Sequence, residues 1–206
     1  MEKPMSPGLA VFDLDGTLSR HDTMFRFLFS EAGKWRVIFY LMLILPLIIL
    51  MFIRLITVRY VKELLLKRFL GGKPLDVLQE RGADFAEKQM PGFLYPAVYK
   101  ALQTHRDQGD TVVLLTAACD LWAEPWCRKE GIIFIGTRLE VLNGFISGKI
   151  SGPNCYGINK RIMLQAFLDE HQFSRITAYG NEKADLHYLR MADKAYLINN
   201  GRIKVI

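Results

Sequence analysis

The stretch Val11–Leu18, VFDLDGTL, places two carboxylates one residue apart, directly after an apolar run and directly before a Gly-Thr turn. Like charges this close repel each other and weaken a strand, so the pair needs compensation. In an extended chain, Asp13 and Asp15 point to the same side. The pattern therefore predicts a cation between them, and Mg²⁺ fits because it takes carboxylate oxygens together with substrate phosphate. A pair of solvated turn aspartates is the alternative.

Short apolar runs alternate with helical segments in the rest of the chain. The runs predict strands at 9–14, 111–116, 175–179 and 194–198, and the segments predict helices at 96–107, from near Asp120, at 159–171 and at 183–192. This alternation indicates an α/β fold with a parallel sheet, in which ligands bind beyond the carboxyl ends of the strands. The polar residues expected at those ends are Asp13, Asp15, Thr116, Asn181 and Asp185.

These side chains suit phosphoryl transfer. Asp13 is expected to attack phosphorus, and Asp15 to protonate the leaving oxygen. The hydroxyl of Thr116 and the backbone N–H groups beside it are expected to hold a phosphoryl oxygen, and Lys160 to offset its charge. Taken singly, each has a plainer alternative: an ordinary strand threonine, an exposed lysine at a helix start, and, for the loop 180–185, a helix cap.

In order, spacing and strand-end placement, these segments resemble the haloacid dehalogenase superfamily of phosphatases. The match comprises DxDGT at 13–17, the threonine at 116, the lysine at 160 and the acidic loop at 180–185. Segments 137–140, 143–148 and 157–160 look most like the phosphoserine-phosphatase-like branch, subfamily IB. The resemblance implies a Rossmann-like core with a helical cap and a nucleophilic aspartate that forms an aspartyl-phosphate.

The resemblance also implies the site residues. The catalytic residues would be Asp13, Asp15, Thr116 and Lys160. The substrate would be bound by Asp22, Thr116, Ala117 and Lys160. Mg²⁺ would be bound by Asp13, the Asp15 carbonyl and Asn181, with Asp185 in support. Asp22 sits where related phosphatases carry an acidic residue near the substrate, and a helix N-cap is the alternative.

Asn181 departs from the family pattern, which usually has aspartate at this position. The amide offers a neutral oxygen, so one negative charge is missing from the expected metal site. Asp185 is expected to compensate directly or through a water. Weaker metal affinity follows, and a non-catalytic module that binds phosphate or lipid stays an alternative.

Residues 37–53 form an uncharged run bounded by Arg36 and Arg54 and interrupted by Pro46. The run is short for a membrane span. A single crossing would also put Asp13 and Thr116 on opposite sides of the bilayer, so we reject it. Two options remain: a re-entrant or interfacial helical hairpin bent at Pro46, or a soluble apolar cap or dimer interface. Basic residues at both ends favour the membrane.

The predicted organisation is a catalytic core of 8–30 and 95–206, with a helical cap of 31–94 whose segment 37–56 associates with the membrane. The net charge of +6 suits an anionic partner. Nucleic acid is not expected, because the chain has no zinc spacing, RNP-like segment or base-reading basic helix. Three cysteines without C-x-x-C spacing indicate a reducing compartment, and the first residues lack a secretory signal.

The sequence thus predicts a Mg²⁺-dependent phosphomonoesterase on the cytoplasmic face of a bacterial inner membrane. The apolar insertion resembles that of the membrane-bound phosphatidylglycerophosphate phosphatases, which implies a phospholipid substrate. A cytoplasmic phosphatase of soluble metabolites such as phosphoserine is the alternative. The oligomeric state is left open.

Overall fold

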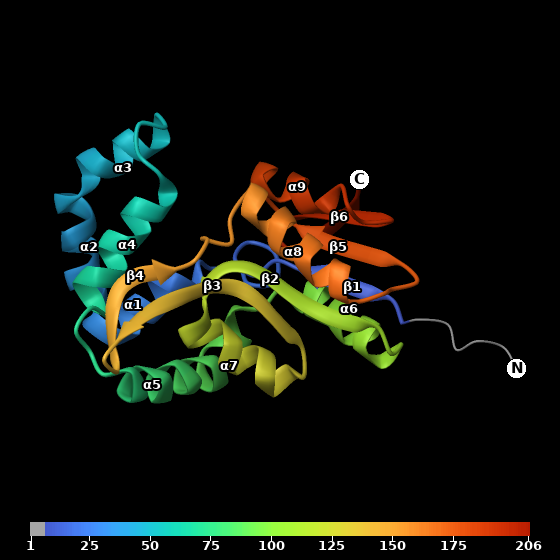
Figure 1. Cartoon of the computed structure of the whole chain (residues 1–206), viewed down its shortest axis with the longest axis horizontal. Helices are drawn as coiled ribbons and strands as arrows, with labels where there is room; N and C mark the ends of the chain where they lie inside the picture. The colour runs from blue at the N-terminus through green and yellow to red at the C-terminus, as the bar shows by residue number, and fades with distance from the viewer. Residues whose placement is uncertain (1–6) are drawn as a thin grey trace, which may run out of the picture.

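The computed structural model describes residues 7–206, so the part of the N-terminal expectation that concerns residues 1–6 lies outside the described residues. Its sheet has seven strands in the order β4-β3-β2-β1-β5-β6-β7 (Figure 1). The strands are β1 (Leu9–Phe12), β2 (Thr111–Cys119), β3 (Ile133–Leu142), β4 (Phe145–Ser151), β5 (Ile176–Gly180), β6 (Lys194–Asn199) and β7 (Arg202–Val205).

The four predicted strands correspond to β1, β2, β5 and β6, and they pair in parallel. In the register, Phe12 lies between Leu114 and Tyr179, so the chain segments after these residues meet at one edge of the sheet. β2 runs beyond Thr116 through an irregularity that ends at Cys119. β3, β4 and β7 were not among the predicted strands, and β4 and β7 pair antiparallel with their neighbours.

Helices cover both faces of the sheet, and β1 is therefore buried on both sides. Ala10 and Phe12 pack toward one core and Leu9 and Val11 toward the other. The core helices are α6 (Pro96–Asp107), α7 (Asp120–Glu130), α8 (Ile158–Glu170) and α9 (Leu186–Leu189). The predicted helix 183–192 is wrong in form: the chain makes a short 3-10 turn η2 (Lys183–Asp185) and then α9, because the Asp185 side chain turns back to accept hydrogen bonds from Asn181 N and Glu182 N.

The insertion between β1 and β2 is entirely helical. It comprises α1 (Thr23–Ala32), α2 (Lys34–Leu43), α3 (Leu45–Phe52), α4 (Val58–Phe69), α5 (Leu75–Lys88) and the 3-10 turn η1 (Met90–Phe93). Helices α2, α3 and α4 rise from the sheet as a separate lobe (Figure 1). Its base is held by β4, because Arg59 donates to the main-chain oxygens of Ile150 and Gly152.

The apolar run forms two helices rather than one. α2 and α3 are bent by 66° at Ile44, and Pro46 lies in the first turn of α3. The predicted bend near Pro46 is therefore confirmed. Among residues 7–206, no single helix is long and apolar enough to cross a bilayer, and α2 with α3 reaches that length and composition only as a bent pair.

Candidate active site

Asp13 follows the last residue of β1, where its backbone N–H still donates to the main-chain oxygen of Tyr179 (3.1 Å). The side chain therefore starts from a backbone position fixed by the central strands. It is almost fully buried, and it accepts a hydrogen bond from Lys160 Nζ on Oδ1 (2.7 Å). Asp13 is thus a rigidly held carboxylate at the carboxyl edge of the sheet, as the sequence predicts.

Lys160, from the first turn of α8, lies between two carboxylates. Its Nζ is 2.7 Å from Asp13 Oδ1 and 2.6 Å from Asp185 Oδ1, and the residue is only 3% exposed. Burial raises the pKa of Asp13 to about 6, against the lowering effect of Lys160. Burial alone would lower the pKa of Lys160, but the two carboxylates hold it above its usual value. The three side chains form one charge cluster with a net charge of −1.

Both carboxylate oxygens of Asp185 have partners. Oδ1 accepts from Lys160, while Oδ2 accepts from the backbone N–H groups of Asn181 (3.0 Å) and Glu182 (3.1 Å). This arrangement shapes the loop after β5 and positions the lysine. Direct metal binding by Asp185 stays a prediction.

Asp15 lies two residues further along the same loop, and its Oδ1 accepts from the backbone N–H of Thr23 (2.9 Å). Burial raises the pKa of Asp15 well above its usual value, and the neighbouring negative charge of Asp22 adds to the shift. A raised pKa makes a carboxyl group better suited to donate a proton to a leaving oxygen. Burial thus raises the pKa of both aspartates of the motif, while only Asp13 has the opposing contact with Lys160.

Thr17 and Asn181 lie beside Asp13 and form an oxygen-rich spot. The Thr17 hydroxyl is 3.3 Å from Asp13 Oδ2 and 3.1 Å from Asn181 Oδ1. A hydroxyl has one proton and can donate to only one of these oxygens at a time. Gly16 makes the close approach possible, because its φ is 82° and a Cβ there would overlap the Asn181 side-chain nitrogen.

The donor set suits a hard cation of modest affinity. Within residues 7–206, no three His, Cys, Asp or Glu side chains are grouped to hold a metal ion. Mg²⁺, however, needs only one or two carboxylates, with carbonyl oxygens, waters and phosphate as its other ligands. The oxygens Asp13 Oδ2 and Asn181 Oδ1, which share the single proton of Thr17, meet that description.

The loop after Thr116 forms the next wall of the site. The Thr116 hydroxyl accepts from Ala118 N (3.0 Å) and is almost fully buried, so it shapes the loop that exposes Ala117 and Ala118 to the cavity. From the cap, Lys62 donates to the main-chain oxygen of Ala117 (2.5 Å) and to Asn154 Oδ1 (3.3 Å). Core and cap thus meet at the threonine loop.

Asp22 begins α1, where its side chain accepts from Phe25 N (3.1 Å). The alternative of a helix N-cap is therefore what the structure shows. Asp22 also lines the same cavity as Asp13 and Asp15, so its contact with substrate stays a prediction.

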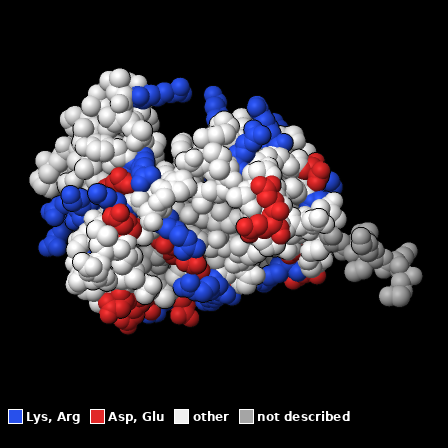
Figure 2. Space-filling view, viewed as in Figure 1, with Lys and Arg blue, Asp and Glu red and all other residues white. Residues whose placement is uncertain are grey.

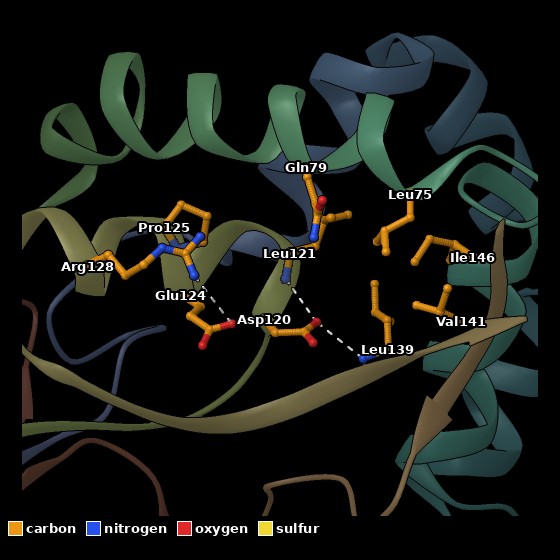
Figure 3. Close-up of a pocket in the computed structure, with 10 residues that line it drawn as sticks. All are labelled: Leu75, Gln79, Asp120, Leu121, Glu124, Pro125, Arg128, Leu139, Val141 and Ile146. Carbon is orange, nitrogen blue, oxygen red and sulfur yellow. Dashed lines mark hydrogen bonds and ion pairs between the residues drawn. The ribbon is translucent and has the colours of Figure 1, made fainter. Parts of the chain in front are cut away.

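One cavity of about 790 Å³ joins these groups. Asp13, Asp15 and Lys160 lie on its core side, whereas Met51, Phe52, Arg54, Val58 and Lys62 line it from the cap. A smaller cavity of about 280 Å³ lies between α5, α7 and the β3–β4 pair, where Asp120 accepts from the backbone N–H of Leu139 (Figure 3). This second cavity lies apart from the catalytic carboxylates, has both apolar and charged residues in its walls, and contains no residue of the predicted site.

Sequence reasoning missed several residues of the large cavity and its surroundings, among them Thr17, Lys62 and Asn154. A signal for Lys62 was present, because it falls within the buried stripe of α4 beside Val61 and Leu65. A charged residue on an apolar helical stripe needs a polar partner. Thr17 and Asn154 had no comparable signal, because their roles arise from contacts between distant segments.

Comparison with known proteins agrees with this geometry. Residues 10–190 match the family described as haloacid dehalogenase-like hydrolase. Protein CicA of Caulobacter vibrioides is 33% identical over 200 residues, which cover 95% of this chain and 88% of CicA.

Two solved structures share the fold. A protein of unknown function from Bordetella pertussis has a TM-score of 0.77 at 20% identity, covering 93% of this chain and 89% of that one. A phosphoserine phosphatase in its apo form has a TM-score of 0.63 at 16% identity, covering 92% and 84%. The chain therefore belongs to the haloacid dehalogenase-like hydrolase family, as an enzyme whose structural neighbours include phosphoserine phosphatases.

Proposed function

We propose that this protein is a Mg²⁺-dependent phosphomonoesterase that forms an aspartyl-phosphate on Asp13 and acts on a lipid phosphate at a membrane surface. The observation that carries the chemistry is the buried cluster of Asp13, Lys160 and Asp185 at the carboxyl edge of the sheet. A buried carboxylate held by a lysine, and open to a cavity, is a positioned nucleophile.

The chain's own groups divide the reaction between them. Asp13 attacks phosphorus through its carboxylate oxygen, and the phosphorus bond to the alcohol oxygen breaks as that oxygen takes a proton from Asp15. Lys160 and the N–H groups of the threonine loop offset charge on the phosphoryl oxygens. Asp15 then removes a proton from the water that cleaves the aspartyl-phosphate, which restores both carboxyl groups.

Mg²⁺ would be held by Asp13, the Asp15 carbonyl and Asn181, and when bound it neutralises charge on the phosphoryl group. The two oxygens that share the single Thr17 proton support this assignment. Asn181 supplies a neutral oxygen, so we expect weaker Mg²⁺ binding than an aspartate would give.

The surface of the cap supports a membrane location. Its large apolar side chains are exposed: Trp35, Phe39, Met42, Leu43, Leu45, Ile49, Phe52, Ile53 and Leu55. Trp35 is 78% exposed and Phe52 76%. An apolar patch of this kind is unusual on a protein surface that faces only water.

The charge around this patch favours an anionic bilayer as its partner. Residues 32–62 contain no Asp or Glu, and their basic residues are Lys34, Arg36, Arg54, Arg59 and Lys62. In the view of Figure 2, the lobe is mostly white with basic side chains at its margins. Apolar side chains between basic ones match the acyl boundary and anionic head groups of a membrane surface.

The same segment supplies one wall of the catalytic cavity, and this links the membrane to the substrate. Phe52 and Val58 are both exposed on the cap and line the cavity that contains Asp13. A phosphomonoester with an apolar tail could place its phosphate at Asp13 while the tail follows the cap toward the bilayer. The cavity geometry thus favours a lipid phosphate.

The test has two arms. Phosphate release from phosphatidylglycerophosphate in mixed micelles and from soluble phosphomonoesters is measured with and without Mg²⁺, with Asp13→Asn as the control. Preferential lipid turnover that needs Mg²⁺ and vanishes in the variant is expected, whereas Mg²⁺-dependent turnover of soluble esters alone would refute the lipid substrate.

The second arm measures binding to vesicles that contain phosphatidylglycerol. The double variant Phe39→Asp/Phe52→Asp should abolish co-sedimentation, whereas Leu142→Asp, at an exposed apolar position on β3, should not. Equal binding by both variants would refute the membrane role of the lobe.

A further inference from the structure

Lys62 is a buried ammonium group that the cap directs into the catalytic cavity. It lies on α4, is 8% exposed, and lines the same cavity as Asp13 and Lys160. Its two hydrogen-bond acceptors, the main-chain oxygen of Ala117 and Asn154 Oδ1, are both neutral. An ammonium group has three N–H donors, so these contacts use two of them.

The charge of Lys62 is felt by Asp22, where it opposes the rise in pKa that burial causes, but the two side chains do not form an ion pair. No carboxylate of residues 7–206 forms an ion pair with Lys62. Lys160, in contrast, contacts two carboxylates. Asp22 lines the same cavity, but its carboxylate caps α1 through Phe25 N. Burying a charge costs free energy unless a partner compensates it, so binding of an anion from outside the chain would stabilise the Lys62 ammonium group.

Packing does not require a lysine at this position. Its neighbours on the buried face of α4 are Val61, Leu65, Leu66 and Phe69, all apolar. An aliphatic side chain would continue that stripe without any desolvation cost. The lysine is therefore a feature of the cavity rather than of the core.

We propose that Lys62 binds a second anionic group of the substrate, located on the alcohol side of the phosphomonoester; this proposal rests on the proposed phosphatase function. In-line attack by Asp13 places the leaving oxygen on the opposite side of phosphorus from Asp13. The cap forms the cavity wall that faces the core carboxylates, and Lys62 enters from that cap. The site thus selects phosphomonoesters whose alcohol carries its own negative charge.

The recognised group is an anionic oxygen group, either a phosphodiester or a carboxylate. Two substrate pairs distinguish these sources. Short-chain phosphatidylglycerophosphate is compared with short-chain phosphatidic acid, and 3-phosphoglycerate with glycerol 3-phosphate. In each pair, only the first compound carries a second anionic group on the alcohol.

The expected result is that the full-length protein prefers the doubly anionic member of at least one pair, and that Lys62→Met removes the preference. A charge-assisted hydrogen bond corresponds to about a 10- to 100-fold change in relative kcat/KM. Lys67→Met makes the same charge change on an exposed position of the same helix and should keep the preference. Equal losses on both members of each pair, or an unchanged preference in Lys62→Met, would overturn the proposal.

Binding and stability measurements separate this proposal from the phosphatase function. Calorimetry on Asp13→Asn and on Asp13→Asn/Lys62→Met gives affinities for the same compounds without turnover, so a preference that depends on Lys62 supports the proposal even if no hydrolysis occurs. Because no carboxylate of the described residues 7–206 forms an ion pair with Lys62, Lys62→Met should also leave the Tm of the free protein within about 3 °C of the original or above it. A fall of more than about 5 °C would show a structural role and overturn the proposal.

Discussion

Replacing Lys160 by Met tests the charge cluster directly. The substitution keeps the length of an unbranched side chain but removes the cation that contacts Asp13 and Asp185. Two buried carboxylates then face each other without a counter-ion. Breaking a buried ion pair from one side costs about 3–5 kcal/mol of unfolding free energy at neutral pH.

The sign of the pH dependence follows from Asp13. In the wild type its folded pKa is about 6, above its ordinary value of 3.8, so its stabilising contribution is present below 3.8 and lost as pH rises through 6. Lys160 lowers this pKa, so its removal raises the folded pKa of Asp13. The unfolding free energy of the variant therefore continues to fall at pH values above 6, where that of the wild type no longer changes. The variant's deficit is its loss of unfolding free energy relative to the wild type. Each carboxylate that stays protonated in the folded variant increases this deficit by about 1.4 kcal/mol per pH unit, or about 2 kcal/mol between pH 6 and 7.5.

The assay is urea unfolding of both proteins in EDTA at these two pH values, followed by the fluorescence of the buried residues Trp122 and Trp126. The double variant Lys160→Met/Asp185→Asn should recover part of the deficit at pH 7.5, because only one carboxylate is left. A deficit of the same size at both pH values would show that the cost is one of packing, and it would refute the electrostatic reasoning.

Three other substitutions have defined outcomes. In a urea titration, Gly82→Ala should lower the unfolding free energy by about 1–3 kcal/mol, because the new Cβ would overlap the main-chain oxygen of Leu121. This loss outweighs the better helix propensity of alanine. Gly92→Ala, where the Cβ would meet open space, should be neutral in the same titration. Asn181→Asp should lower the Mg²⁺ concentration for half-maximal phosphate release by about 10-fold, through one added negative charge; an unchanged Mg²⁺ requirement would remove residue 181 from the metal site. Thr23→Val should lower the unfolding free energy by about 1–3 kcal/mol in a thermal melt, because it leaves the buried indole N–H of Trp122 without its acceptor. An unchanged unfolding free energy would contradict this role of the hydrogen bond.

The central strands could be predicted because they are apolar throughout. β1 is buried on both faces, and this gives an uninterrupted run that periodicity identifies. β7 has only exposed residues, and β3 mixes buried, half-buried and exposed residues without a regular period, so neither carries that signal. β4 depends on pairing with β3 after the turn at Asn143 and Gly144, which is a long-range property of the fold.

The residues of the site divide in the same way. Asp13, Thr116 and Lys160 could be placed from the sequence because strand ends in a parallel sheet converge. The contacts of the Thr17 hydroxyl with Asp13 and Asn181 could not be predicted, because they depend on the approach of two loops 164 residues apart. Lys62 is an intermediate case, since its position on an apolar stripe indicates an unusual role but not its partners.

The place of the insertion in the chain connects these observations. The insertion leaves the sheet at the carboxyl end of β1, so its helices begin beside the nucleophile. The chain comes back to the same loop at Tyr95, whose N–H donates to the main-chain oxygen of Leu18, before α6 leads to the opposite edge where the parallel strand β2 begins. Any surface that the insertion presents to a membrane is thereby tied to the catalytic cavity, as the shared residues Phe52 and Val58 show. The same connection allows α4 to bring Lys62 to the loop after Thr116. A change in the cap can therefore alter which alcohol is accepted while the cluster of Asp13, Lys160 and Asp185 stays intact, because that cluster is built from the core alone.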